Sequence, residues 1–147
     1  MSLVENKKAH FNYEVLETYE AGMELFGFEV KSLRKGQGSL EGARVLIRGG
    51  EAFVVGITIP PYQPANTPKD YEPTRTRRLL LGKKEILKLS GIEHQRGLTI
   101  VPVSVYSKKS KLKVAVAVVR GKKKYDKRES IKRRDTEREI RRTLKDR

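Results

Sequence analysis

The sequence contains no cysteine and only two histidines, so several kinds of chemistry lack the residues they need. Without cysteine the chain can form neither disulfides nor thiolate nucleophiles. His10 and His94 lie outside any metal-ligand spacing, which argues against a structural zinc site. No apolar run approaches the roughly 18 residues of a membrane-spanning helix. These absences exclude a disulfide-stabilised domain, a thiol enzyme and a membrane-spanning helix.

Enzymatic motifs are also missing. No glycine-rich phosphate-binding loop precedes a helix, and Glu20 with Glu24 is best interpreted as a pair of solvated surface charges. Residues 1–6 lack the apolar stretch of a secretory signal. We therefore expect a cytoplasmic protein that is not an enzyme and that needs no cofactor or metal.

Positive charge is what the chain has in abundance. Lysine and arginine number 33 against 18 acidic residues, which gives a formal net charge of +15 and a pI near 10.1. Such a balance favours nucleic acid as the partner first and an anionic membrane surface second. The basic C-terminal segment has too few apolar side chains to anchor in a membrane, so we expect no membrane partner.

More than half of the net charge lies at the C-terminus. Residues 120–147 hold 14 of the 33 basic residues and six acidic ones, a net +8, with only four apolar side chains. So little apolar area cannot offset the backbone entropy of folding. Like-charge pairs such as Arg134 with Arg138 also oppose an isolated helix. The sequence predicts a folded domain over 1–119 and a basic tail over 120–147 that is disordered when free and becomes helical on a polyanion.

Short hydrophobic segments with alternating polarity dominate the rest of the chain and predict strands. The clearest is 111–119, where a leucine and three valines at even positions share one face. The glycine pair 49–50 predicts a hairpin turn, and five of the six prolines within 60–73 predict a long loop. The predicted strands are 13–19, 28–33, 45–48, 52–59, 98–106 and 111–119, and the predicted short helices are 20–25 and 83–89.

These elements favour a mainly β fold. About six strands with glycine-rich turns, one or two short helices and no βαβ alternation predict a small antiparallel barrel of the OB type. Pro102 lacks a backbone donor, so its strand is expected to lie at an edge or to carry a bulge there.

Three basic clusters are interleaved with side chains that can touch bases, as in RNA-binding proteins. The first precedes the first strand, the second follows the proline-rich loop and the third opens the tail. Their members are Asn6, Lys7, Lys8, His10 and Tyr13; Arg75, Arg77 and Arg78; and Gly121, Lys122, Lys123, Lys124, Tyr125, Asp126, Lys127 and Arg128. No helix-turn-helix, zinc finger or zipper is visible, and OB barrels often bind single-stranded or folded RNA, so RNA is favoured over DNA.

Four motifs resemble, in order, those of the small protein B family, the SsrA-binding proteins. They are 6–10, 20–25 with 29–34, 73–81, and 121–123 with 126–128. The resemblance spans essentially the whole chain and implies an OB-type barrel. It places Asn6, Glu20 and Leu80 at positions tied to tmRNA binding. Lys31 and Arg34 lie within the second motif and are expected to join the RNA contacts.

The resemblance also implies a function and partners. Family members bind the tRNA-like domain of tmRNA and deliver it, with elongation factor Tu, to ribosomes stalled without a complete codon. Their tail lies in the vacant decoding site and mRNA channel and folds there into a helix. Residues 121–128 and Ile140 are accordingly expected to contact the ribosome, with Asp126, Lys127 and Arg128 at positions needed for tagging.

Two residues depart from the family pattern. Tyr125 stands where the family often has His, and Arg120 stands where Lys is common. A tyrosine still stacks on a base but removes any imidazole protonation. The rival interpretation is a ribosomal protein, a basic barrel with an arm buried permanently in ribosomal RNA. Composition does not separate the two, whereas co-purification with one small stable RNA would.

Overall fold

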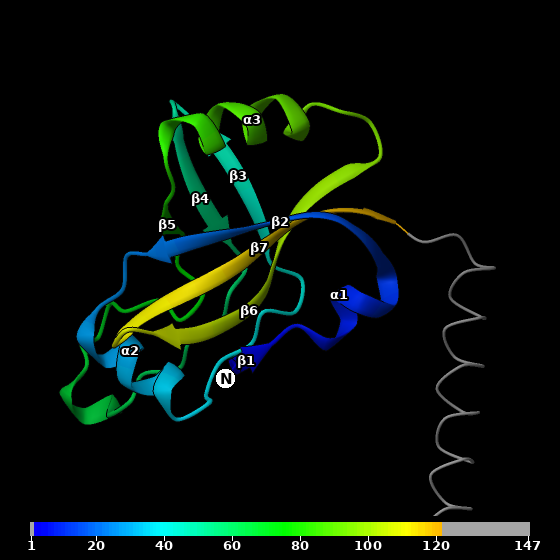
Figure 1. Ribbon diagram of the computed structural model, residues 1–147. Coiled ribbons are helices and arrows are strands. Elements are labelled where there is room, and N and C mark those ends of the chain that lie inside the picture. The colour runs from blue at the N-terminus through cyan, green and yellow to red at the C-terminus, as the bar shows by residue number, and fades with distance from the viewer. Residues whose placement is uncertain (1, 122–147) are drawn as a thin grey trace, which may run out of the picture.

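The computed structural model describes residues 2–121 apart from the side chain of His10, and the predicted tail from Lys122 to Arg147 lies outside the described part. Seven strands form one antiparallel sheet in the order β1-β6-β7-β2-β5-β4-β3 (Figure 1). The strands are β1 (Ser2–Glu5), β2 (Tyr13–Met23), β3 (Arg44–Arg48), β4 (Glu51–Val55), β5 (Arg77–Leu80), β6 (Leu98–Lys108) and β7 (Lys111–Gly121). The helices are α1 (Lys7–Asn12), α2 (Gly27–Arg34), α3 (Lys83–Glu93) and the 3₁₀ helix η1 (Pro64–Asn66).

The fold is mainly β and OB-like, as predicted. The sheet is not closed, because β3 packs against β6 and does not pair with the other edge strand, β1. A partly open barrel of this kind buries one face of the curved sheet and leaves part of the other accessible. In Figure 1, α3 lies across the end of the sheet that carries β3 and β4, whereas α2 lies beside the tips of β6 and β7.

The ladder between β2 and β7 extends past the predicted domain boundary. It pairs residues from Tyr13 with Gly121 to Gly22 with Lys113. Arg120 lies in this ladder opposite Glu14, and its guanidinium bonds the Glu14 carboxylate at 2.7 Å. The folded part therefore includes Arg120 and Gly121, which the sequence assigned to the tail.

The predicted helix over 20–25 is wrong. Those residues continue β2 up to Met23, where Ala21 pairs with β7 and Gly22 pairs with both β7 and β5. The helical signal was a capping threonine and a few good helix formers around a glycine. Ladder hydrogen bonds to two neighbouring strands outweigh so weak a local preference.

The predicted strand over 28–33 is also wrong, because this segment forms α2. Glu29, Ser32 and Leu33 are buried together, which is the three- and four-residue spacing of one helix face. The Glu29 side chain also accepts a hydrogen bond from the backbone N–H of Phe26 at 2.8 Å, which satisfies a free donor at the start of the helix. Six alternating residues are too few to distinguish the two periods.

Several other predictions are confirmed. Gly49 and Gly50 both have positive φ, as a two-residue hairpin turn between β3 and β4 requires, although β4 ends at Val55 and not at residue 59. The helix predicted over 83–89 is α3, which continues past Gly91 to Glu93. The register of β6 against β7 shifts between Pro102 and Ser104, which is the bulge expected at the proline. No sequence pattern predicted β1, α1 or β5.

The sheet buries apolar side chains on both of its faces. The main core lies inside the curve and is built from buried side chains that include Leu33, Leu79, Val105 and Val114. A smaller cluster of Val101, Ala117 and Val119 lies outside the curve, where Ala9 of α1 covers it. The part of the outer face beyond α1 is left free to carry polar side chains.

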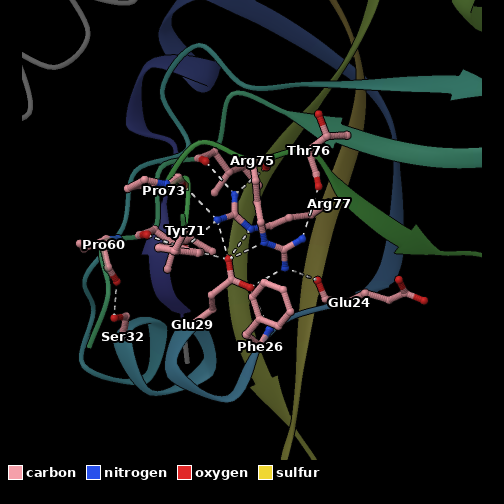
Figure 2. Close-up of polar contacts among 12 residues, drawn as sticks. Glu24, Phe26, Glu29, Ser32, Pro60, Tyr71, Pro73, Arg75, Thr76 and Arg77 are labelled. Carbon is pink, nitrogen blue, oxygen red and sulfur yellow. Dashed lines mark hydrogen bonds and ion pairs between the residues drawn. The ribbon is translucent and has the colours of Figure 1, made fainter. Parts of the chain in front are cut away.

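A buried carboxylate joins α2 to the loop that leads into β5 (Figure 2). Glu29 has no exposed surface, and neither has Arg77, whose Nε and Nη2 bond one Glu29 oxygen at 2.8 and 2.6 Å. Arg75 reaches both oxygens of the same carboxylate, at 3.2 and 2.5 Å, and the Tyr71 hydroxyl adds a bond at 2.9 Å. In the same region Ser32 bonds the carbonyl of Pro60 at 2.6 Å.

These bonds leave Glu29 ionised. Burial raises the pKa of Glu29, but the hydrogen bonds from Arg75, from the Phe26 N–H and from Arg77 outweigh it, so the pKa lies below its ordinary value. Arg77 gives its remaining hydrogen bonds to the backbone carbonyls of Ile57, Pro73 and Arg75 and to the Tyr71 hydroxyl. A buried charge pair with all of its polar atoms satisfied is costly to break by changing only one partner.

Glu29→Gln should therefore destabilise the fold strongly. The variant keeps the size of the side chain but leaves Arg77 buried without its counter-ion, which costs about 3–5 kcal/mol of unfolding free energy. Urea denaturation at neutral pH measures this loss. The matched control is Glu24→Gln, which breaks only an exposed ion pair with Arg78 and should change the stability little.

The same variant should show a pH dependence. Because the pKa of Glu29 is lowered by folding, its contribution is complete above the unfolded pKa of about 4.3 and is lost as the pH falls through the lower folded value. The stability difference between the wild type and Glu29→Gln should shrink as the pH falls through this range. An unchanged difference would contradict an ionised Glu29.

Candidate RNA-binding surface

The outer face of the sheet near the β6–β7 turn carries a group of polar side chains. Glu20 on β2, Lys113 on β7, and Tyr106 and Lys108 on β6 all point away from the main core, because they alternate with core residues on their strands. Tyr106 lies directly opposite Lys113 in the ladder. Three strands thus bring together residues that are up to 93 positions apart in sequence.

Glu20 connects two of these side chains. Its carboxylate accepts a hydrogen bond from the Tyr106 hydroxyl at 2.5 Å and lies 3.2 and 3.3 Å from the ammonium of Lys108. The hydrogen bond from Tyr106 and then that from Lys108 lower the pKa of Glu20. Partial burial, the bond to Glu20 and its negative charge raise the pKa of Tyr106 to about 12. At neutral pH Glu20 is therefore a carboxylate and Tyr106 a neutral phenol.

Leu80 presents an apolar side chain beside this group. On β5 the buried Arg77 and Leu79 alternate with the exposed Arg78 and Leu80, so Leu80 projects outward and is 49% exposed. Gly22 lies opposite it on β2, and a Cβ at Gly22 would lie only 3.3 Å from the Cβ of Leu80. The missing side chain at Gly22 therefore gives Leu80 room to lie over the strand.

Arg34, the last residue of α2, lies at the edge of this surface, because its partner Ser107 alternates with Tyr106 on β6 and faces the core side of the strand. Its guanidinium donates to the carbonyl of Ser110 at 2.9 Å and lies 3.5 Å from the hydroxyl of Ser107, which ties the helix end to the β6–β7 turn. A hollow of about 340 Å³ lies between these elements, and its lining includes Gly22, Arg34, Leu80, Ser110, Lys111 and Lys113. We refer to the surface formed by Glu20, Arg34, Leu80, Tyr106, Lys108, Lys111 and Lys113 as the hairpin face.

The structure brings together Glu20, Arg34 and Leu80 of the predicted site residues on the hairpin face. Tyr106, Lys108, Lys111 and Lys113 were missed, although they share it. Alternation in 111–119 placed Lys113 on the non-core side of its strand, and this was the available signal. Which strand lies next to it depends on the sheet order, which the sequence pattern does not give.

Arg77 does not lie on any surface, so its assignment as an RNA contact is wrong. Its guanidinium is enclosed with Glu29, one oxygen of which accepts hydrogen bonds from both Nε and Nη2 of Arg77. Arg75 is one-quarter exposed and rests over the Phe26 ring at 4.2 Å. Arg78 is exposed on β5 and pairs with Glu24 and Glu51 at 3.3 and 3.2 Å. Its two acidic partners already offset its charge.

Asn6 has a structural position at the start of α1. Its side chain is 8% exposed, and the amide nitrogen donates to the carbonyls of Leu40 and Pro102 at 3.2 and 3.1 Å. Its backbone N–H also bonds the carbonyl of Val103 at 2.7 Å. Asn6 thus joins three segments of the chain and leaves little surface for direct contact with RNA.

The lysines that follow Asn6 lie on a second surface. Lys7 and Lys8 are exposed on α1, and Lys8 pairs with Glu41 at 2.7 Å. Tyr13 is half-buried and packs against the apolar cluster under α1. From Tyr13 to Gly22 the strand β2 spans about 30 Å, so this surface and the hairpin face lie at opposite ends of one strand.

Lys31 belongs to neither surface. It is exposed on α2, and its ammonium lies 5.8 Å from the centre of the Tyr62 ring, with Lys35 at 5.4 Å from the same ring. The tail residues Lys122 to Arg128 and Ile140 lie outside the described residues. Within residues 2–121, no helix is long and apolar enough to cross a membrane, and no group of three or more metal-ligating side chains is found.

Removing the Glu20 carboxylate should lower the pKa of Tyr106. In Glu20→Ala the phenol loses both its hydrogen-bond acceptor and a nearby negative charge, so its pKa should fall from about 12 toward the ordinary value of about 10. NMR titration of ring-labelled tyrosine measures this change. Glu17→Ala is the control, because Glu17 bonds Tyr19 and should move only that tyrosine's pKa. A Tyr106 pKa that stays near 12 in Glu20→Ala would contradict the contact.

Comparison with known proteins identifies the family. The sequence matches the SmpB protein family over residues 3–146. It is 48% identical over 143 residues to the SsrA-binding protein of Gloeothece citriformis (97% of this chain, 92% of the relative) and 50% identical over 141 residues to that of Trichodesmium erythraeum (96% and 90%). A chain in the solved structure described as "tmRNA-SmpB: a journey to the center of the bacterial ribosome" aligns with a TM-score of 0.69 at 39% identity, covering 86% of this chain and 92% of that one. The chain belongs to the SmpB protein family, the family of the SsrA-binding proteins.

Proposed function

We propose that this protein binds the tRNA-like domain of tmRNA and delivers it to stalled ribosomes for trans-translation. The observation that carries the proposal is the match to SsrA-binding proteins, in which about half of the residues are identical over nearly the whole chain. A permanent ribosomal protein, the rival interpretation, has no comparable support. The role is binding, and the site needs no catalytic group.

The hairpin face has the side chains that this role requires. Arg34, Lys111 and Lys113 supply positive charge for phosphates, and Leu80 supplies an exposed apolar surface for a ribose or a base. Lysine ammonium groups act as point charges that neutralise a backbone without reading its sequence. Such a face suits a folded RNA recognised by its shape.

The tail has a separate part in the proposal. Residues 122–147 would enter the vacant decoding site and mRNA channel, with Asp126, Lys127, Arg128 and Ile140 among the residues that act there. Elongation factor Tu would accompany the complex during delivery, and the protein would work in the cytoplasm. The high positive charge of this segment supports contact with ribosomal RNA.

The RNA retained by the purified protein tests the proposal directly. After purification at moderate salt, sequencing should find one predominant small stable RNA, tmRNA. Recovery of whole ribosomal subunits without tmRNA would favour the ribosomal-protein interpretation and overturn the proposal.

Binding to the tRNA-like domain should depend strongly on salt. With about five phosphate contacts, the logarithm of the association constant should fall against the logarithm of salt concentration with a slope of roughly −3.5 to −4.5. A filter-binding series from low to moderate salt measures it. A slope near zero would remove the electrostatic basis of binding.

A chain that ends after Gly121 should separate RNA binding from tagging. The described fold is complete at that residue, so the truncated protein should stay folded and keep most of its tmRNA affinity while tagging on stalled ribosomes is lost. Normal tagging by the truncated chain would show that the tail is not needed.

A milder variant is Ile140→Pro, which costs a helix about 3 kcal/mol and should depress tagging while leaving tmRNA binding intact.

A further inference from the structure

Glu20 places a negative charge on a surface that is otherwise positive. A carboxylate repels phosphate, so its presence among Lys108, Lys111 and Lys113 needs an explanation other than direct contact with the RNA backbone. Its contacts supply one. Both of its oxygens are engaged by Lys108, and one of them also accepts the hydrogen bond from Tyr106. Glu20 therefore acts by orienting two neighbouring side chains.

The ionised carboxylate also fixes the direction of the hydrogen bond with Tyr106. An ionised carboxylate can only accept, so the single phenolic hydrogen must be donated to Glu20. The lone pairs of the phenol oxygen are then the only hydrogen-bonding groups that Tyr106 can offer to a ligand. The hydrogen bond between Tyr106 and Glu20 is exposed, so the phenol oxygen lies at the surface as an acceptor without a free hydrogen.

An acceptor at this place discriminates among the groups of a nucleic acid. Phosphodiester oxygens are acceptors only, and two facing acceptors form no hydrogen bond. A ribose 2′-hydroxyl can donate, and it is the group by which proteins distinguish RNA from DNA. The neighbouring ammonium groups of Lys108 and Lys113 can hold the phosphates on either side of such a ribose.

We propose that Tyr106 is a specificity-determining residue for RNA, whose phenol oxygen accepts a hydrogen bond from one 2′-hydroxyl of the bound RNA, with Glu20 as the positioning residue that fixes the polarity of the phenol. This inference rests on the proposed function, since it assumes that the RNA lies on the hairpin face. The other residues of the hairpin face supply charge or apolar area, whereas Tyr106 supplies a hydrogen-bond acceptor.

The chain contains a matched control for this arrangement. Tyr19 donates to Glu17 at 2.6 Å, and Lys88 lies 3.4 Å from the same carboxylate, so the same three residue types meet at another place. Tyr19 packs against the main core, and Lys88 belongs to α3, on a different side from the hairpin face. Tyr19→Phe removes the same atom as Tyr106→Phe away from the proposed contact.

The experiment is interference mapping with the full-length protein. The probe is the tRNA-like domain of tmRNA, transcribed with 2′-deoxy phosphorothioate nucleotides incorporated at about one random position per molecule. Bound and free molecules are separated and cleaved at the phosphorothioates. Ordinary phosphorothioate nucleotides that keep the 2′-hydroxyl correct for the effect of sulfur.

The wild type should show at least one position at which loss of the 2′-hydroxyl weakens binding. That interference should disappear in Tyr106→Phe and remain in Tyr19→Phe. For unmodified RNA the affinity of Tyr106→Phe should fall about 3- to 10-fold, the range for one neutral hydrogen bond. Glu20→Ala frees the phenolic hydrogen to donate, so the same interference should weaken although Tyr106 is still present.

Each contrary result has a distinct meaning. An interference pattern that is the same in the wild type, Tyr106→Phe and Glu20→Ala would overturn the proposal, even if the affinities differ. If Tyr106→Phe fails to fold, as its melting temperature would show, the pattern of Glu20→Ala decides the question alone. If the wild type does not bind the domain at all, the proposed function fails first.

Discussion

The carboxylate of Glu29, shared by two guanidinium groups and closed off from water, is the interaction on which the rest of the surface depends. It holds Arg77 inside the protein. Because side chains alternate along β5, Arg78 and Leu80 then point outward. It also anchors α2, whose last residue, Arg34, reaches the β6–β7 turn. The basic Arg77 is thus buried and the apolar Leu80 is exposed, which is the reverse of what charge alone would predict.

The hairpin face depends on these buried contacts of Glu29 and on the bulged ladders of β2, β6 and β7. The three strands carry alternating core and surface residues, so the outer positions of each fall side by side. The carboxylate of Glu20 then contacts both Tyr106 and Lys108 on this face. α1 covers the far end of the same outer face, which leaves the hairpin end accessible.

Sequence reasoning predicted the features that are local and repeated. The alternation in 111–119 and the Gly49–Gly50 turn have few alternative structures, and both were confirmed. The segments 20–25 and 28–33 were assigned the wrong way round, because each is short and its state is set by distant partners: β5 and β7 for the first, Arg75 and Arg77 for the second. Composition likewise cannot distinguish a buried arginine from an exposed one, and Tyr106 joins Glu20 only through the sheet order.

We propose that the RNA lies on the hairpin face. The most direct measurement is lysine reactivity footprinting, in which the protein is acylated with and without the tRNA-like domain and each modified lysine is quantified by mass spectrometry. Lys108, Lys111 and Lys113 should be protected by the RNA, whereas Lys69 in the proline-rich loop and Lys83 on α3 should react equally in both samples. Protection of Lys69 and Lys83 with unchanged reactivity at the β6–β7 hairpin would show that the RNA binds elsewhere.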